Sequence, residues 1–245
     1  PPPSPPPPAA VFPLSRVAGV RHPVDASGNP FKMLADTAWS LIAQLTREDA
    51  TLYFNDRKSR GFNAVLISLL EHKFATNAPS NIYGAKPFTT NGDFATPNEA
   101  YFAHAAYCLQ LAADRDMLVL LTPSYIGFTG TDEGWYTEMV ANGATKMRAY
   151  GQYVATRFQS FKNILWVEGG DANPANKGVV QAVANGIRDI AGTSVLQTAH
   201  CQSGTAALEY WSGEPWLLVD TVYERTDVAS AVVTEYQRAA QLPVF

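Results

Sequence analysis

Short apolar runs alternate with helix-like segments along almost the whole chain, and this alternation restricts the possible folds more than any other feature of the sequence. Seven runs of four to nine residues have the length and composition of buried strands. They occupy residues 31–35, 62–70, 117–121, 164–167, 194–200, 216–224 and 242–245. Strands that alternate with helices predict an α/β fold with a parallel sheet and right-handed crossover connections.

The segments between these runs carry signals for helix ends. Thr46 is a predicted N-cap because acidic residues follow it in the first turn, and its helix should end near Arg60. Residues 96–99 (TPNE) match a capping box, with Thr96 as the cap and proline at the first helical position. Further helices are predicted over residues 147–158 and 179–190, and after the cap Asp227.

Two parallel architectures fit this pattern, and the end of the first predicted strand separates them. A doubly wound nucleotide-binding sheet normally carries a Gly-x-Gly-x-x-Gly sequence there, whereas this strand leads into Asp36-Thr37-Ala38-Trp39. A chain of 245 residues, 47% of them apolar, suits a single (β/α)8 barrel, or TIM barrel, with a sizeable core. Because we find seven strand signals instead of eight, we expect the barrel to be incomplete at the C-terminus.

The first residues have a different composition from the rest of the chain. Seven of the first eight residues are proline, which favours an extended polyproline II spacer. We therefore expect a Pro-rich linker over residues 1–13 and one catalytic domain over residues 14–245. A spacer of this kind normally joins two domains, so the chain is expected to belong to a longer, secreted protein.

Charge and residue patterns argue against several other functions. A net charge of −4 gives no electrostatic surface for nucleic acid, and no apolar run approaches the ~18 residues of a membrane span. The four histidines show no metal-ligand spacing, and we expect neither a metal nor another cofactor. No Gly-x-Ser-x-Gly sequence is present, and Cys201 should point away from the neighbouring His200 because adjacent strand residues face opposite sides.

The stretch 163–174 contains the strongest candidates for catalysis. An apolar strand ends there in Glu168-Gly169-Gly170-Asp171, and barrel enzymes hold their acid/base groups at the carboxyl ends of their strands. Asp171 is the first catalytic candidate and Glu168 the second. The alternative is a strand followed by a Gly-Gly turn in which Asp171 only caps the next segment.

Polar and aromatic side chains also follow the other predicted strands. Carboxylates, histidines and tyrosines at converging strand ends suit proton transfer and binding at a hydroxylated substrate. The tryptophans could stack on a sugar ring or pack over the mouth of the barrel. The residues that we expect to contact substrate are Asp36, Trp39, His72, Tyr125, Trp135, His200, Tyr223 and Glu224.

Several segments, in this order, resemble the catalytic domain of apiosidase-like proteins, a family of (β/α)8 glycoside hydrolases. The resemblance covers about residues 14–245. The segments that carry it are LADTAW (34–39), LTREDA (45–50), RGFN (60–63), TPNEAYF (96–102), GWY (134–136), NILWV (163–167), GGD (169–171) and LQTAH (196–200).

The resemblance implies a glycoside hydrolase that acts on an oligo- or polysaccharide of plant or microbial origin. It places the acid/base at Asp171, after the fourth strand, and a nucleophilic Glu after the seventh strand, beyond Phe245. Glu168 and Glu224 depart from the residues expected at their positions, so the resemblance makes neither of them the nucleophile. Two rival hypotheses stay open: a non-catalytic carbohydrate-binding barrel, and a lyase or isomerase that uses His200 and Asp171.

Overall fold

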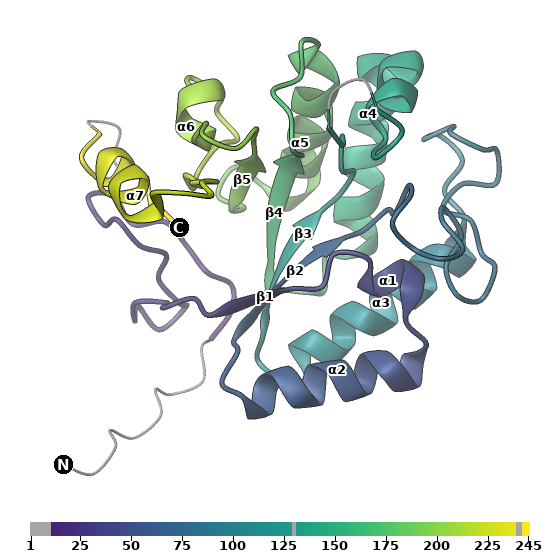
Figure 1. The fold of residues 1–245 in the computed structure, drawn as a ribbon, viewed down its shortest axis with the longest axis horizontal. Coiled ribbons are helices and arrows are strands. Elements are labelled where there is room, and N and C mark those ends of the chain that lie inside the picture. The colour runs from purple at the N-terminus through teal and green to yellow at the C-terminus, as the bar shows by residue number, and fades with distance from the viewer. Residues whose placement is uncertain (1–10, 129–130, 239–241) are drawn as a thin grey trace.

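The computed structural model describes residues 11–128, 131–238 and 242–245 (Figure 1). Most of the predicted Pro-rich linker, residues 1–10, lies outside the described residues. In Figure 1 the helices α2 to α5 lie on one side of a central sheet, and α7 and the C-terminus lie on the other. This arrangement is the α/β architecture that the sequence predicts.

The sheet has five parallel strands in the order β1-β2-β3-β4-β5. Each strand pairs with the next one along the chain, as expected when every connection crosses back over the same face. The strand ends therefore converge on one edge of the sheet. The strands are β1 (Ala35–Thr37), β2 (Ala64–Ser68), β3 (Leu118–Thr122), β4 (Ile164–Gly169) and β5 (Gln197–His200).

The first strand begins later than the sequence predicts. The predicted strand covers residues 31–35, but β1 begins at Ala35. The side chain of Asn63 accepts a hydrogen bond from Leu34 N (2.7 Å) and donates one to Lys32 O (2.7 Å). This amide satisfies backbone groups of residues 32 and 34 in place of a neighbouring strand, and the regular ladder begins at Ala35.

The sixth and seventh predicted strands occupy the expected places, but within the described residues neither forms a regular strand. Leu218 N donates to Gln197 O of β5 (3.0 Å), and Asp220 forms a parallel bridge with Val244. Pro243 has no N–H to donate, which limits a continuous ladder here. The prediction of regular strands at 216–224 and 242–245 is therefore wrong, although these segments extend the curve of the sheet.

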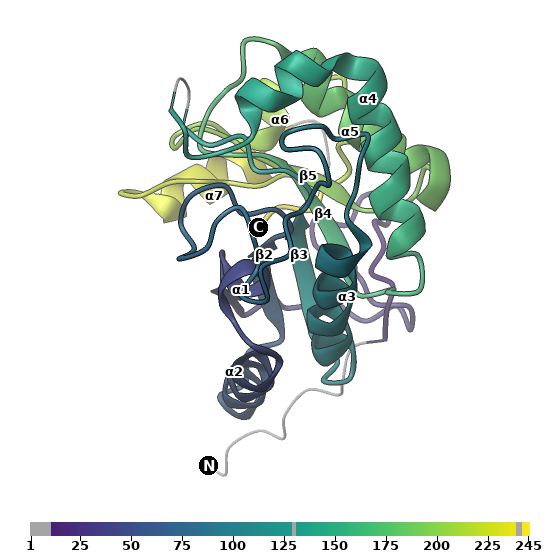
Figure 2. The same ribbon diagram turned by 90° about the vertical axis from the view of Figure 1, so that its right-hand side faces the viewer.

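Four long helices connect the strands: α2 (Arg47–Ser59), α3 (Glu99–Ala113), α4 (Tyr136–Arg157) and α5 (Lys177–Ala191). The predicted N-cap at Thr46 is confirmed, since its side chain accepts a hydrogen bond from Asp49 N. Helix α4 bends at Gly143, where φ is 73°. Figure 2 shows α4 and α5 side by side, and the two helices pack along their lengths.

The predicted capping box at residues 96–99 is wrong by two residues. Asn98 is the N-cap of α3, and its side chain accepts a hydrogen bond from Ala100 N (3.2 Å). Thr96 instead accepts a hydrogen bond from Thr90 N (3.1 Å), and Pro97 forms an antiparallel bridge with Phe88. Asparagine caps helices as well as threonine does. The loop before α3 therefore runs two residues further than the sequence predicts, and the helix begins after Asn98.

Three shorter helices complete the described fold: α1 (Leu41–Gln44), α6 (Ala207–Tyr210) and α7 (Val228–Tyr236). The predicted cap at Asp227 is confirmed by its hydrogen bond from Ser230 N (3.2 Å). Among the helices of the described residues, none is both long and apolar enough to cross a bilayer.

The core has two layers, one on each face of the sheet. Along β4, Trp166 belongs to the layer between the sheet and the helices, whereas Leu165 and Val167 belong to the layer inside the barrel. Leu14 and Phe31 of the N-terminal segment pack into the inner layer. The two faces of each strand thus differ in what they contact, and this alternation decides which polar residues reach the site.

Candidate functional site

A cavity of about 650 Å³ opens at the carboxyl ends of the strands. It is large enough for a ligand of a few rings. Its lining brings together residues from all five strands and from the loops beyond them. The lining residues are Thr37, Trp39, Ser40, Leu66, Phe74, Leu120, Tyr125, Glu133, Val167, Asp171, His200, Thr221, Val222, Tyr223 and Phe245.

Asp171 lies in this cavity, in the loop that follows β4. The hydroxyl of Tyr125 donates a hydrogen bond to Asp171 Oδ2 (2.9 Å), and His200 Nε2 lies 3.0 Å from Asp171 Oδ1. The contact with His200, followed by the Tyr125 hydroxyl and the charge of Arg225, lowers the pKa of Asp171, although partial burial opposes this change. Asp171 is therefore a fixed carboxylate with one oxygen toward each partner.

Two glycines before Asp171 explain how it reaches this position. Gly169 has φ of +86°, a left-handed conformation that favours glycine. A Cβ on Gly170 would lie 2.8 Å from the Tyr125 ring, so only glycine leaves room for that ring. Gly170 N also donates to His200 O (3.0 Å). The Gly-Gly pair thus packs Asp171 against both of its partners.

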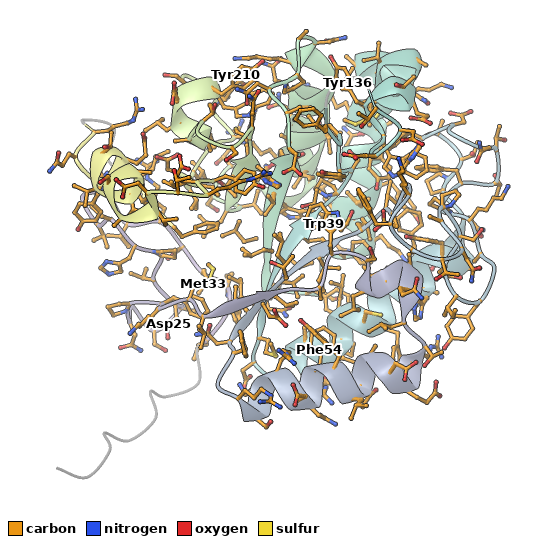
Figure 3. The ribbon with its side chains drawn as sticks, in the orientation of Figure 1. Asp25, Met33, Trp39, Phe54, Tyr136 and Tyr210 are labelled. Carbon is orange, nitrogen blue, oxygen red and sulfur yellow. The ribbon has the colours of Figure 1, made fainter. Side chains whose placement is uncertain are left out.

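Aromatic rings form much of the cavity wall. Trp39 meets the Tyr125 ring edge to face, with centroids 4.8 Å apart, and it lies near the centre of the molecule in Figure 3. His200 meets Tyr223 in the same way at 4.6 Å. Burial raises the pKa of Tyr125, so its hydroxyl keeps its proton and stays a donor to Asp171. The structure thus brings together five of the predicted residues.

Glu168, the second catalytic candidate, is not part of the cavity. Its side chain points to the helix layer, on the same side of β4 as Trp166. The residue is 1% exposed, and burial raises the pKa of its carboxyl well above the usual value. The left-handed Gly169 separates it from Asp171, so the structure does not bring the two catalytic candidates together in the cavity.

Three predicted contact residues lie behind the cavity wall. Asp36 faces α2, where it accepts a hydrogen bond from the Tyr53 hydroxyl (3.0 Å) and lies 3.2 Å from Arg57 Nη1. His72 Nε2 lies 3.1 Å from Glu138 Oε1. Trp135 is buried against the His72 ring, with centroids 4.7 Å apart. These side chains support the loops around the site and do not line it.

Glu224, also predicted to contact substrate, lines a separate cavity of about 220 Å³. Its Oε1 accepts hydrogen bonds from Arg225 N (2.6 Å) and Thr226 N (2.9 Å), and these backbone donors lower its pKa. Glu224 therefore organises the turn before α7. Its neighbour Tyr223 lines both this cavity and the main one.

Sequence reasoning missed ten of the fifteen residues that line the cavity. Phe74 and Glu133 lie in loops with no strand signal nearby, and both line the cavity. Phe74 is 53% exposed. The unusual length of the loop after β2 and the glycines around Glu133 are the only signals that could have indicated them.

The described residues offer no support for metal or thiolate chemistry. They contain no group of three His, Cys, Asp or Glu side chains that could hold a metal ion. Both cysteines are free and buried, and burial raises the pKa of Cys201 to about 12. Cys201 is therefore no activated nucleophile, as the sequence predicts. Asp171 and Glu133 are the carboxylates among the described lining residues.

Comparison with known proteins identifies relatives of this chain. The family described as "Apiosidase-like, catalytic domain" matches residues 18–245. A search of curated protein sequences gives no significant match. The family match covers the strands, the helices and the cavity described above.

Solved structures of glycoside hydrolases have a similar fold. A glycoside hydrolase family 5 protein from Bacteroides vulgatus ATCC 8482 is 23% identical, with a TM-score of 0.78 over 94% of this chain and 52% of that one. A structure described as "Glycoside hydrolase" is 24% identical, with a TM-score of 0.78 over 94% and 55% of the two chains. An endo-1,4-β-mannanase from Rhizomucor miehei is 12% identical, with a TM-score of 0.65 over 94% and 80%.

The chain spans about half the length of the first two structures. At these identities the likeness shows the fold, and it confirms the prediction of a (β/α)8 barrel with part of its strands present. The five regular strands correspond to an open arc of such a barrel.

Proposed function

This chain belongs to the apiosidase-like catalytic-domain family, and we propose that it hydrolyses an O-glycosidic bond in a plant or microbial polysaccharide. One observation carries the proposal: a carboxylate, held by a tyrosine and a histidine, lies in an aromatic-walled cavity at the strand ends. Aromatic rings suit the apolar faces of sugars, and a positioned carboxyl group suits proton transfer to a glycosidic oxygen.

In the proposed reaction, protonated Asp171 donates its proton to the leaving oxygen as the glycosidic bond breaks. Tyr125 and His200 hold the carboxyl group in one orientation, which reduces the entropy lost on reaching the transition state. Because these contacts lower the pKa of Asp171, the protonated form is favoured at acidic pH. The enzyme should therefore work best under acidic conditions.

Glycoside hydrolysis also uses a second carboxylate, as nucleophile or as base. The family resemblance implies a Glu after the seventh strand for this role, and the described cavity residues do not include one at that place. An extracellular location and attachment to other domains through the Pro-rich residues stay predictions from the sequence.

The first experiment measures sugar release from a panel of aryl glycosides and plant polysaccharides. Asp171→Asn should lower kcat by at least ~100-fold, the usual range for a lost general acid. Glu168→Gln is the matched control: it also removes a carboxyl group from the same stretch, and it should leave kcat within about twofold. If the two variants lose activity equally, Asp171 has no special role and the proposal fails.

A second candidate function rests on the contact between Asp171 and His200. A histidine 3.0 Å from a carboxylate could also serve a lyase or isomerase that moves a proton on carbon. Reaction in ¹⁸O-labelled water separates the two functions. A hydrolase incorporates the label into one product, whereas a lyase or isomerase does not. Glycan binding without any product would instead favour the carbohydrate-binding barrel.

A further inference from the structure

Two loops meet beside the catalytic candidate and place one unassigned side chain each in the cavity. Phe74 belongs to the loop after β2, and Glu133 belongs to the loop between β3 and α4. Lys73 Nζ donates a hydrogen bond to Asp132 Oδ1 (2.5 Å), which links the residues immediately before them. The two lining residues thus come from loops that are joined to each other.

A buried carboxylate fixes the first loop. Glu71 is 2% exposed, and its Oε1 accepts hydrogen bonds from His72 N (2.9 Å), Lys73 N (3.2 Å) and Phe74 N (3.1 Å). Its Oε2 accepts another from Ser40 Oγ (2.5 Å). Three consecutive backbone donors on one oxygen hold the chain in a single conformation. The exposed Phe74 ring is therefore carried by a rigid backbone, as a preformed binding surface requires.

Backbone contacts fix both ends of the second loop. Trp135 N donates to Tyr125 O (2.8 Å), and a Cβ on Gly134 would lie only 2.2 Å from Gly127 N. The two ends of the loop therefore touch, which only glycine permits at this distance. Glu133 directly precedes this contact, so its backbone is held in place at the cavity wall.

The carboxylate of Glu133 is available to a ligand. Within the part of the chain that the structure describes, its oxygens have neither a hydrogen bond nor an ion pair. Its charge also raises the pKa of Tyr125, whose hydroxyl contacts Asp171. Glu133 and Asp171 line the same cavity, so one bound molecule can touch both.

We propose that Phe74 and Glu133 form a subsite for an uncharged sugar residue beside Asp171. The Phe74 ring stacks on the C–H face of the sugar, and Glu133 accepts hydrogen bonds from its hydroxyl groups. This assignment rests on the proposed glycoside hydrolase function. An uncharged sugar is favoured because Asp171 and Glu133 are both acidic, and the described lining residues include no Lys or Arg. A uronate would meet two carboxylates in the lining, whereas the nearby cations Arg225 and Lys73 lie outside it and contact Tyr223 and Asp132.

The test measures binding to an array of plant oligosaccharides, including mannohexaose, xylohexaose and hexagalacturonate. All proteins carry Asp171→Asn, so that bound glycans are not cleaved. Phe74→Ala should weaken binding of the best neutral glycan by about tenfold or more, and Phe74→Trp should preserve it. Glu133→Gln should weaken the same glycan several-fold and reduce the preference over hexagalacturonate.

Two control variants match these changes in size and charge. Phe128→Ala removes a phenylalanine of similar exposure (56%) that does not line the cavity. Glu48→Gln removes an exposed carboxylate from α2. Both should bind like the parent protein, and thermal melts of all variants establish that each is folded.

The outcomes separate this subsite from the proposed function. If Asp171→Asn binds neutral glycans and neither Phe74→Ala nor Glu133→Gln weakens that binding, the subsite is wrong and the hydrolase proposal stands. Tighter binding of hexagalacturonate than of every neutral glycan would overturn the uncharged-sugar assignment. If no glycan binds and the unmutated protein releases no sugar, both proposals fail.

Discussion

Asp171 and Glu168 lie three positions apart, yet their surroundings change their acidity in opposite directions. Hydrogen-bond partners lower the pKa of Asp171, whereas burial alone raises the pKa of Glu168. Asp171 therefore holds its proton less tightly than an ordinary carboxyl group does, and Glu168 holds its proton more tightly. The environment, more than the residue type, thus separates a reacting group from a structural one.

The contact between Tyr125 and Asp171 predicts a change in the pH dependence of activity. A general acid must carry its proton, so kcat/KM falls as pH rises through the pKa of Asp171. Tyr125→Phe removes a hydrogen bond that favours the carboxylate, which raises that pKa. The alkaline limb of the kcat/KM profile should therefore move to higher pH.

Tyr53→Phe is the control for this measurement, because its hydroxyl contacts Asp36 behind the cavity wall. Its profile should match that of the unmutated enzyme. An alkaline limb that stays in place, or moves to lower pH, in Tyr125→Phe would show that the hydrogen bond does not set the acidity of Asp171.

The sequence predicted which strand ends carry the site but could not always predict which side chains face it. Tyr125, Asp171 and His200 were expected together and lie together. Asp36 was expected there too, yet its neighbour Thr37 lines the cavity. A shift of one residue in a short strand reverses the face of every side chain, and composition does not fix that register.

At the scale of helices, α4 and α5 approach so closely that their backbones touch. A Cβ on Gly151 would lie 2.2 Å from Val183 O, and one on Gly186 would lie 2.2 Å from Arg148 O. The two glycines form a reciprocal contact, one from each helix. Any larger side chain at either position must push the helices apart.

Gly151→Ala and Gly186→Ala should therefore each lower the free energy of unfolding by about 1–3 kcal/mol, the usual cost of overpacking. At an exposed helical position, replacing glycine by alanine raises the free energy of unfolding by about 1 kcal/mol. The sign of the change at Gly151 and Gly186 therefore tests whether the helices are in close contact. Ala149→Gly, on the exposed face of α4, measures the propensity effect alone. Urea unfolding gives all three values, and a gain in stability at Gly151 would contradict the close contact.

Helix ends and strands differed in how well the sequence predicted them. The caps Thr46 and Asp227 were predicted because each makes a local hydrogen bond with its own helix. The start of β1 was not, because Asn63, from a distant part of the sequence, satisfies the backbone before it. Local chemistry is visible in a sequence, whereas a long-range hydrogen bond requires the fold.

At the scale of the whole molecule, the C-terminal segments are joined by a buried cluster of charged groups. Asp220 is buried beside Glu235 of α7, and Asp220 Oδ1 accepts a hydrogen bond from Leu208 N (2.8 Å). Glu235 also pairs with Arg238. Burial, together with the Glu235 carboxylate, raises the pKa of Asp220 to about 6. This cluster connects α6, α7 and the extended segment that borders the main cavity.

The raised pKa predicts how stability depends on pH. The folded state holds the Asp220 proton more tightly than the unfolded state does. The stability that this proton adds is complete at pH values below 3.8, the ordinary pKa of an aspartate. This contribution is lost as pH rises through about 6. Asp220→Asn has the same shape, stays uncharged and keeps the acceptor for Leu208 N. It should therefore stabilise the protein at pH ~8 by on the order of 2 kcal/mol, with little effect near pH ~4.

Thermal unfolding between these two pH values tests the prediction. Asp114→Asn, at an exposed position after α3, controls for the loss of one negative charge. Its stability should follow the pH dependence of the unmutated protein. A loss of stability in Asp220→Asn at alkaline pH would show that the charged form of Asp220 is favoured in the fold.

The overall architecture was the most predictable property, because strand–helix alternation and apolar runs depend on many residues at once. The sixth and seventh strands were the exception. Their apolar patterns are strand-like, but in the described residues they are joined by one isolated bridge and a few backbone hydrogen bonds, and neither forms a regular strand. An apolar pattern reports burial, and regular pairing also needs a neighbour in register.

The position of Trp39 gives the protein an intrinsic optical signal. All five tryptophans belong to the described residues, and Trp135, Trp166, Trp211 and Trp216 are buried. Trp39 is the partly exposed one, and it lines the cavity beside Tyr125. A water-soluble quencher would thus dim the emission of Trp39 selectively, and a ligand in the cavity would shield it. Occupancy of the site could then be followed by fluorescence without any attached dye.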